Sequence, residues 1–264
     1  MKQRIITAII AAGLFLPFVF IGGFPLVLFT FLMAGVGLFE LLRMRKIRLF
    51  SIPGLLSLLV VWIFILPADY DGFLDVMHLS KIEIGLFAVL FYLTYMVASK
   101  NHFSIDDAAY SILSVLYMGV GFHFFVEVRE ASVWILFYSL FMIWATDSGA
   151  YFIGRALGKR KLWPEISPNK TVEGAIGGIV CAVIVSVLFS AFGYIEWYII
   201  GLVTIILSAF GQIGDLVESA LKRHYEVKDS GKLLPGHGGI LDRFDSLLFV
   251  WPLLYFIFDA FSLL

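Results

Sequence analysis

The sequence is poor in charged residues, and this scarcity decides its class. Only 15% of the 264 residues are Asp, Glu, Lys or Arg, whereas 61% are hydrophobic and the mean hydropathy is +0.95. An ordinary soluble domain is about half apolar and about a quarter charged. A single core of this size cannot hide the excess of apolar surface. A water-soluble globular fold is therefore excluded, and a bilayer is the remaining solvent.

The chain also has only one cysteine and almost no net charge. Cys181 is the single cysteine, which excludes a disulfide within the chain and leaves the redox compartment undetermined. Because it lies in an apolar run, we expect it to pack as a small hydrophobic residue. The net charge of −1 favours neither acidic nor basic partners, and we expect no nucleic acid to bind.

Long apolar runs dominate what is present. A bilayer crossing takes roughly 20 apolar residues to cover about 30 Å of hydrocarbon. We predict an all-α integral membrane protein with about nine transmembrane helices. The runs lie at 5–21, 24–42, 51–67, 84–98, 108–128, 133–154, 172–194, 197–219 and 244–263. The first run is longer than the apolar region of a usual signal peptide and leads straight into the second, so we expect it to be retained.

The distribution of positive charge gives an orientation. With nine crossings, 17 of the 19 Lys and Arg residues fall on one side, and only Lys81 and Arg129 fall on the other. Cytoplasmic loops carry the excess of Lys and Arg. The N-terminus and the large loops are therefore expected in the cytoplasm and the C-terminus outside. A short single-module chain of this kind indicates the inner (cytoplasmic) membrane of a bacterium.

Polar residues are distributed unevenly along the chain. Residues 1–140 are nearly featureless apart from the apolar runs, and we expect them to form a scaffold and a possible dimer surface. Charged and glycine-rich stretches gather in 141–264, where we expect the catalytic site. Glu40, near the end of one early run, and His123, inside another, are ionisable. Such residues are functional candidates by default, but each stands alone, which favours structural hydrogen bonding or a position at the membrane interface.

The densest polar stretch runs from Asp215 to Asp245. Asp215, Ser219 and Lys222 are spaced i, i+4 and i+7, which places them on one helix face. Asp242 and Asp245 are three residues apart at the start of the last run. Two helix ends that carry carboxylates, joined by a basic loop with glycines, suit a divalent cation that holds a polyphosphate. Mg²⁺ usually takes one or two carboxylates together with substrate phosphates and water.

The loop between these helix ends contains the sequence from Pro235 to Gly239. Glycines let backbone N–H groups approach phosphate oxygens without obstruction by a Cβ. The loop ends just before a helix N-terminus, which favours anions. A cytoplasmic loop with solvated charges is the alternative, and it accounts for single residues better than for the whole set at these spacings. His237 is either a proton carrier or, as we favour, a residue that positions the loop.

Three stretches resemble the phosphatidate cytidylyltransferases. Between Ser219 and Asp245 the chain carries Ser-x-x-Lys-Arg, Lys-Asp-x-Gly, Leu-Pro-x-His-Gly-Gly and Asp-Arg-x-Asp, without departure from the family pattern over 27 residues. The stretch from Ser167 to Gly174, Ser-Pro-Asn-Lys-Thr-Val-Glu-Gly, resembles the second cytoplasmic motif of the family. The stretch from Asp147 to Arg155 resembles the helix before it. The likeness covers roughly residues 144–246.

The resemblance implies a reaction and its components. CTP and phosphatidic acid would give CDP-diacylglycerol and pyrophosphate at the cytoplasmic membrane face, by in-line attack of the lipid phosphate on the α-phosphorus. The family implies a Mg²⁺ requirement, with a second cation left open, and a homodimer in the lipid bilayer. A phosphomonoester is largely dianionic at neutral pH, because its second pKa is near 6, so no strong base is required. Positioning and cationic stabilisation should supply most of the rate enhancement.

Residue roles follow from fitting this reaction to the charged residues present. The expected metal ligands are Asp215, Asp242 and Asp245. The expected catalytic residues are these three with Lys222, Arg223 and His237. The expected residues for CTP and the lipid phosphate are Ser167, Lys170, Thr171, Glu173, Ser219, Lys228, Gly238, Gly239 and Arg243. Glu173 lies three residues after Lys170 and could orient it. Asp147 either supports the site from outside or is structural.

Other classes of protein explain less of the sequence. A transporter or channel would account for the spans and for acids such as Asp147, but not for a basic loop with Pro-x-His-Gly-Gly. The CDP-alcohol phosphotransferases carry paired aspartates in spacings that are absent here. A CTP-dependent lipid kinase would use the same nucleotide but phosphorylate an alcohol. A purely structural membrane protein would gain nothing from the motifs.

Overall fold

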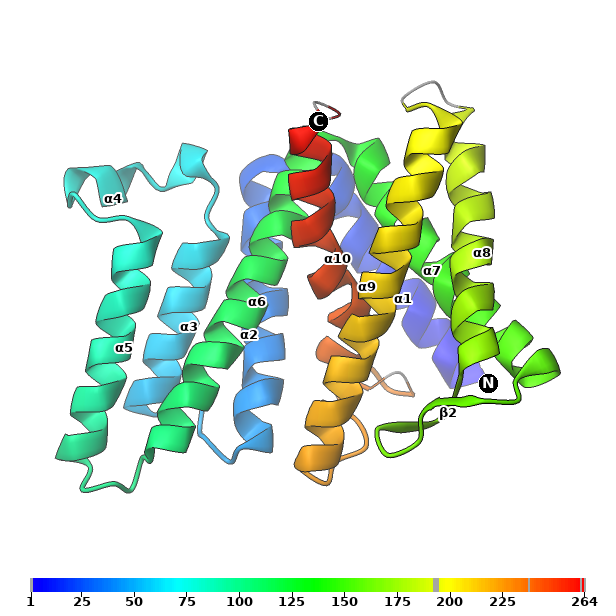
Figure 1. The fold of residues 1–264 in the computed structure, drawn as a ribbon. Helices are drawn as coiled ribbons and strands as arrows, with labels where there is room; N and C mark the ends of the chain where they lie inside the picture. The colour runs from blue at the N-terminus through cyan, green and yellow to red at the C-terminus, as the bar shows by residue number, and fades with distance from the viewer. Residues whose placement is uncertain (1, 192–194, 237, 262, 264) are drawn as a thin grey trace. The chain divides into compact units, whose positions relative to one another are not determined.

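The computed structural model describes residues 2–191, 195–236, 238–261 and 263 (Figure 1). Within these residues, each of the nine predicted apolar runs coincides with a helix. The elements are α1 (Lys2–Ile21), α2 (Gly23–Met44), α3 (Ile52–Ile65), η1 (Ala68–Tyr70), α4 (Gly72–Val76), α5 (Lys81–Ala98), α6 (Ile105–Ala131), α7 (Val133–Leu157), β1 (Lys161–Trp163), β2 (Ser167–Thr171), α8 (Val172–Ser190), α9 (Trp197–His224) and α10 (Leu241–Ala260).

Six of the described helices are long and apolar enough to cross a membrane: α2, α5, α6, α7, α8 and α9. Large apolar side chains point outward from them, for example Leu32 on α2, Leu86 on α5 and Leu202 on α9. Exposed apolar faces of this extent require lipid rather than water. The prediction of a helical, multi-pass membrane protein is confirmed. The number nine and the sides on which the termini lie stay predictions, since the apolar parts of α1 and α3 are shorter and α10 carries more charge.

The sequence explains where several helices begin. Gly22 has φ +68°, a conformation that glycine adopts without strain, and it separates α1 from α2. The Ser51 hydroxyl accepts a hydrogen bond from the Gly54 N–H at the start of α3. Ser80 and Glu83 form a reciprocal capping box at the start of α5. These caps satisfy N–H groups that have no partner within the helix.

The chain divides into two compact units. The first unit comprises Met1–Glu127 and Asp229–Arg243, and the second comprises Val128–Lys228 and Phe244–Leu264. The functional division of the chain near residue 140 stays a prediction.

In the first unit, polar contacts join the long helices at buried or half-buried positions. The Tyr110 hydroxyl on α6 donates to the Leu41 carbonyl on α2 at 3.0 Å. The Ser57 and Tyr92 hydroxyls lie 2.7 Å apart between α3 and α5. Hydrogen bonds of this kind help to associate helices where lipid offers no hydrophobic driving force.

In the second unit, α7 and α8 pack closely because glycines line their contact. A Cβ at Gly178 would lie only 2.6 Å from the Thr146 carbonyl oxygen. Small residues at such positions let two helix backbones approach in a membrane. The Thr146 hydroxyl also lies 2.8 Å from that of Ser208, which ties α7 to α9. The Trp251 indole on α10 donates to Ser139 on α7 at 3.1 Å.

A two-stranded hairpin departs from the all-helical prediction. β1 and β2 pair antiparallel, with Lys161 opposite Thr171 and Trp163 opposite Ser167. The prediction left residues 158–171 as a loop, because the hairpin is short and its strands lack an apolar alternation. Figure 1 shows β2 at the start of α8, on the same side of the second unit as the C-terminal end of α9.

Candidate active site

The second unit joins the Ser167–Gly174 motif to the polar stretch that begins at Asp215 through an ion pair. Lys170 is at the end of β2, and its Nζ lies 2.5 Å from Oδ2 of Asp215 on α9. Both side chains are about one third exposed. The Ser219 hydroxyl lies 3.4 Å from the other oxygen of Asp215, as expected from the i, i+4 spacing. The structure therefore confirms the shared helix face of Asp215 and Ser219 and adds Lys170, which is 45 residues earlier in the chain.

Asp245 on α10 joins this cluster because Gly214 lets two helices approach. A Cβ at Gly214 would lie 2.7 Å from the carbonyl oxygen of Asp245 and 3.1 Å from Cα of Ser246. Asp245 interacts electrostatically with Asp215, Asp147 and Lys222, and it accepts a hydrogen bond from the Ser246 N–H. Acids and lysines from α7, β2, α9 and α10 thus share one region of the second unit.

Lys222 has a partner that the sequence-based prediction missed. Its ammonium group is ion-paired with Glu218, one helical turn earlier on α9. The Glu218 side chain is only 1% exposed. The i, i+4 spacing of an acid before a lysine was a signal that could have found this pair. The pair holds the Lys222 cation near Asp245 and neutralises a carboxylate that would otherwise be costly to bury.

The start of α8 corrects the expected role of Glu173. Its carboxylate accepts hydrogen bonds from the backbone N–H groups of Lys159 and Arg160 at 3.0 to 3.3 Å, and so fixes the entry to the hairpin. It does not orient Lys170, which instead pairs with Asp215. Thr171 caps α8 by accepting from the Gly174 N–H at 3.1 Å. Ser167 is the first residue of β2.

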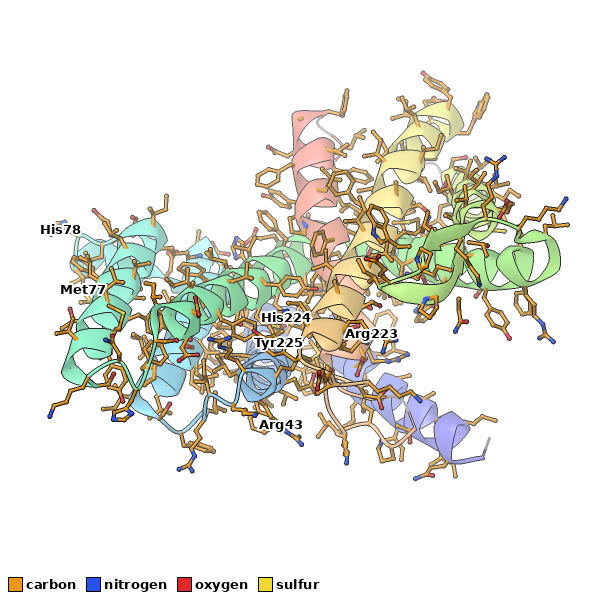
Figure 2. The ribbon with its side chains drawn as sticks, turned by 60° about the horizontal axis from the view of Figure 1, so that its bottom comes forward. Arg43, Met77, His78, Arg223, His224 and Tyr225 are labelled. Atoms are coloured by element: carbon orange, nitrogen blue, oxygen red, sulfur yellow. The ribbon has the colours of Figure 1, made fainter. Side chains whose placement is uncertain are left out.

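The other predicted cations lie near the ends of α9 and α10. Arg223, in the last turn of α9 (Figure 2), is exposed, and its Nε donates to the Ile166 carbonyl of the hairpin turn at 3.3 Å. Lys228 is exposed beyond α9. Arg243 is exposed in the first turn of α10, in the first unit. All three side chains are exposed, and Arg223 also contacts the hairpin.

In the first unit, Asp242 organises the glycine loop. Its Oδ2 accepts from the Ser230 N–H and hydroxyl, both at 2.9 Å, and from the Gly239 N–H at 2.8 Å. We expected the Gly239 N–H to meet a phosphate, and in this structure it meets the Asp242 carboxylate instead. Gly238 has φ +86°, and its carbonyl accepts from the Leu234 N–H at 2.9 Å. The prediction for His237 lies outside the described residues.

The three predicted metal ligands are divided by the two units. Asp215 and Asp245 belong to the second unit, where they interact, and Asp242 belongs to the first. Among the described residues, no three His, Cys, Asp or Glu side chains are placed to hold one ion together. A magnesium ion does not need three protein ligands, because one or two carboxylates with phosphates and water suffice. In the second unit, Asp215 and Asp245 are the two predicted ligands that interact with each other.

Comparison with known proteins identifies the family. The model of the cytidylyltransferase family matches residues 2–261. The chain belongs to this family. Curated relatives include proteins named phosphatidate cytidylyltransferase from Bacillus subtilis (54% identity, 99% of each chain) and from Staphylococcus epidermidis and Staphylococcus aureus (51% and 49% identity, each over 96% of this chain and 97% of the relative).

The match to the cytidylyltransferase family extends beyond the motifs. The resemblance in the sequence was confined to residues 144–246, whereas the family model covers both units almost completely. The helices of the first unit therefore belong to the family fold as well. The matched region includes Glu40, an acid of the first unit that lies outside the three motifs.

Proposed function

We propose that the chain transfers a cytidylyl group from CTP to phosphatidic acid and so forms CDP-diacylglycerol and pyrophosphate. The relatives that share about half of its residues over nearly their whole length carry this activity in their names. The observation that carries the proposal in the structure is the Lys170–Asp215 pair. It joins the Ser167–Gly174 motif to the turn of α9 just before the Ser219–Asp245 motif, and so gathers charged groups from two separate parts of the chain.

The proposed step is an in-line displacement at phosphorus. An oxygen of the lipid phosphate forms a bond to the α-phosphorus of CTP, and the bond from that phosphorus to the bridging oxygen of pyrophosphate breaks. The lipid phosphate is already largely dianionic near neutral pH, since a phosphomonoester has its second pKa near 6. The obstacle is repulsion between two anions and the charge that develops on the leaving group.

The charged residues of the second unit could reduce this repulsion. Lys170 and Lys222 would each hold an ammonium group beside an anionic substrate, with Arg223 exposed at the end of the same helix. Asp215 and Asp245 would hold Mg²⁺, which when bound supplies charge neutralisation at the phosphates. Asp242 would contribute from the start of α10, where it orders the loop. A second cation stays open.

The setting of the reaction is also a proposal. We place the site at the cytoplasmic face of the inner membrane, because 17 of the 19 Lys and Arg residues fall on the side that the positive-inside rule assigns to the cytoplasm. CTP is soluble and phosphatidic acid lies in the bilayer, so a site at helix ends serves both without either crossing the hydrocarbon. The bacterial relatives fit this location. A homodimer follows from the family resemblance.

Label transfer tests the proposed function directly. Purified protein in lipid micelles would receive phosphatidic acid, Mg²⁺ and CTP labelled with ³²P at either the α or the γ position. We expect the lipid phase to gain label from the α position and none from the γ position. Lipid label from γ alone would instead establish a kinase. If neither position labels the lipid while a control enzyme is active in the same assay, the proposed function is wrong and the transporter hypothesis is favoured.

The close approach at Gly214 leads to a first prediction. Gly214→Ala places a Cβ 2.7 Å from the Asp245 carbonyl, so α9 or α10 must shift. A displacement on the order of 1 Å in a site of this kind lowers the rate roughly 100-fold. We expect such a loss of kcat, measured by α-label transfer. Gly201→Ala on the same helix is the control, because its Cβ would lie 3.8 Å from Val183 and clash with nothing. Equal activity of the two variants would contradict the prediction.

A further inference from the structure

A buried acid of the first unit holds the glycine loop from outside the motifs. Glu40 lies near the C-terminal end of α2, and its side chain is 2% exposed. Its carboxylate accepts from the Ile240 N–H at 3.0 Å, the Leu241 N–H at 2.9 Å and the Ser230 hydroxyl at 2.9 Å. These contacts span 190 to 201 residues of sequence. A buried acid with three donors serves structural hydrogen bonding, one of the two roles that the sequence left open for it.

Glu40 and Asp242 together hold three successive N–H groups that lead into α10. The N–H groups of Ile240 and Leu241 go to Glu40, and that of Gly239 goes to Asp242. A helix N-terminus carries partial positive charge, so both carboxylates are favourably placed. The Ser230 hydroxyl lies 2.9 Å from an oxygen of each carboxylate, and its one proton can be donated to only one at a time. The two acids are therefore linked through one side chain.

Two glycines of the loop are explained by Glu40. A Cβ on Gly231 or on Gly239 would collide with the Glu40 carboxylate, because that group occupies the space beside both residues. The sequence-based analysis assigned the Gly238–Gly239 pair to phosphate approach. The structure gives Gly239 a different reason, which is close contact with a side chain from α2. The Thr7 hydroxyl of α1 donates to the Pro235 carbonyl of the same loop at 3.1 Å.

We propose that Glu40 is a positioning residue of the transfer reaction. It anchors Ser230, Ile240 and Leu241, and so fixes the loop groups that hold the carboxylate of Asp242. The proposal rests on the proposed function, since it assigns Glu40 to the same site. Glu40 acts through the loop and does not touch the reacting atoms.

Replacement of Glu40 by glutamine tests this role. The amide keeps the size of the side chain but turns an NH₂ group toward at least one of the three donors. Partners that orient a metal or catalytic ligand typically contribute about 10- to 100-fold to activity. We expect kcat to fall within that range while KM for CTP and the melting temperature in detergent stay near wild type. Asp75→Asn, an exposed acid on α4, is the matched acid-to-amide control and should keep full activity.

Amide hydrogen exchange separates this inference from the proposed function. In Glu40→Gln, peptides that cover 229–241 should exchange about tenfold faster or more, because N–H groups lose a charged acceptor. This measurement does not depend on catalysis, so it tests whether Glu40 anchors the loop even in an inactive protein. Absence of label transfer by the wild-type protein would contradict the proposed function but not the anchoring. Ser230→Ala, which removes the hydroxyl between Glu40 and Asp242 but leaves the backbone N–H contacts, should give a smaller effect in the same direction and serves if Glu40→Gln fails to fold. Unchanged exchange, or unchanged kcat in an active preparation, would overturn the inference.

Discussion

Asp242→Asn is expected to lower kcat roughly 100-fold or more while the protein stays folded in detergent. The amide oxygen can still accept from the Gly239 N–H, which is 2.8 Å from the native carboxylate. The variant therefore keeps much of the loop geometry. What it loses is the negative charge at the start of α10, beside Ser230. Initial rates of α-label transfer and thermal unfolding would be measured on the same preparations.

Asp259→Asn is the control for this experiment. Asp259 is exposed near the other end of α10, so the variant makes the same chemical change on the same helix. We expect full activity from it. An Asp242→Asn protein that turns over at the wild-type rate would remove Asp242 from the site. A protein that loses activity only in proportion to its loss of folded material would assign Asp242 a purely structural role.

Breaking the Lys170–Asp215 pair should separate activity from stability. The two side chains are 29% and 31% exposed, and an ion pair of that exposure contributes only about 0–1 kcal/mol to folding. We therefore expect Lys170→Met and Asp215→Asn to melt within a few degrees of wild type, since about 1 kcal/mol shifts the melting temperature of a protein of this size by roughly 2–4 °C. Each should nevertheless lower kcat by about 100- to 1000-fold, because the proposed reaction assigns one charge to the substrate and the other to the cation.

A double-mutant cycle sharpens that prediction. If the pair acts as one unit, the double variant should be no slower than the worse single variant, as is common for residues that work together. The Lys81–Asp71 pair is a close match for a control, at 26% and 22% exposure in the first unit. Lys81→Met and Asp71→Asn should keep activity within about twofold. Losses that multiply in the Lys170–Asp215 double variant would contradict a shared role.

Local chemistry made part of the site predictable. Asp215 and Ser219 share a helix face because their spacing is fixed by the helical repeat, and the structure shows their contact at 3.4 Å. Glu218 could have been found by the same rule, as it stands one turn before Lys222. The role of Glu173 could not, because its partners Lys159 and Arg160 are reached only once the hairpin has formed.

The sequence by itself determined the membrane class, the positions of the helices and the residues of the three motifs. These properties depend on composition and on short spacings, which hydropathy and helical periodicity express directly. Only the tertiary structure decided which distant groups meet: Lys170 with Asp215 across 45 residues, and Glu40 with the loop before α10 across about 200. Such pairings are set by the packing of segments that are distant in the chain. Gly214 and Gly239 are needed because a Cβ there would collide with Asp245 or Glu40, and no local sequence pattern identifies those neighbours.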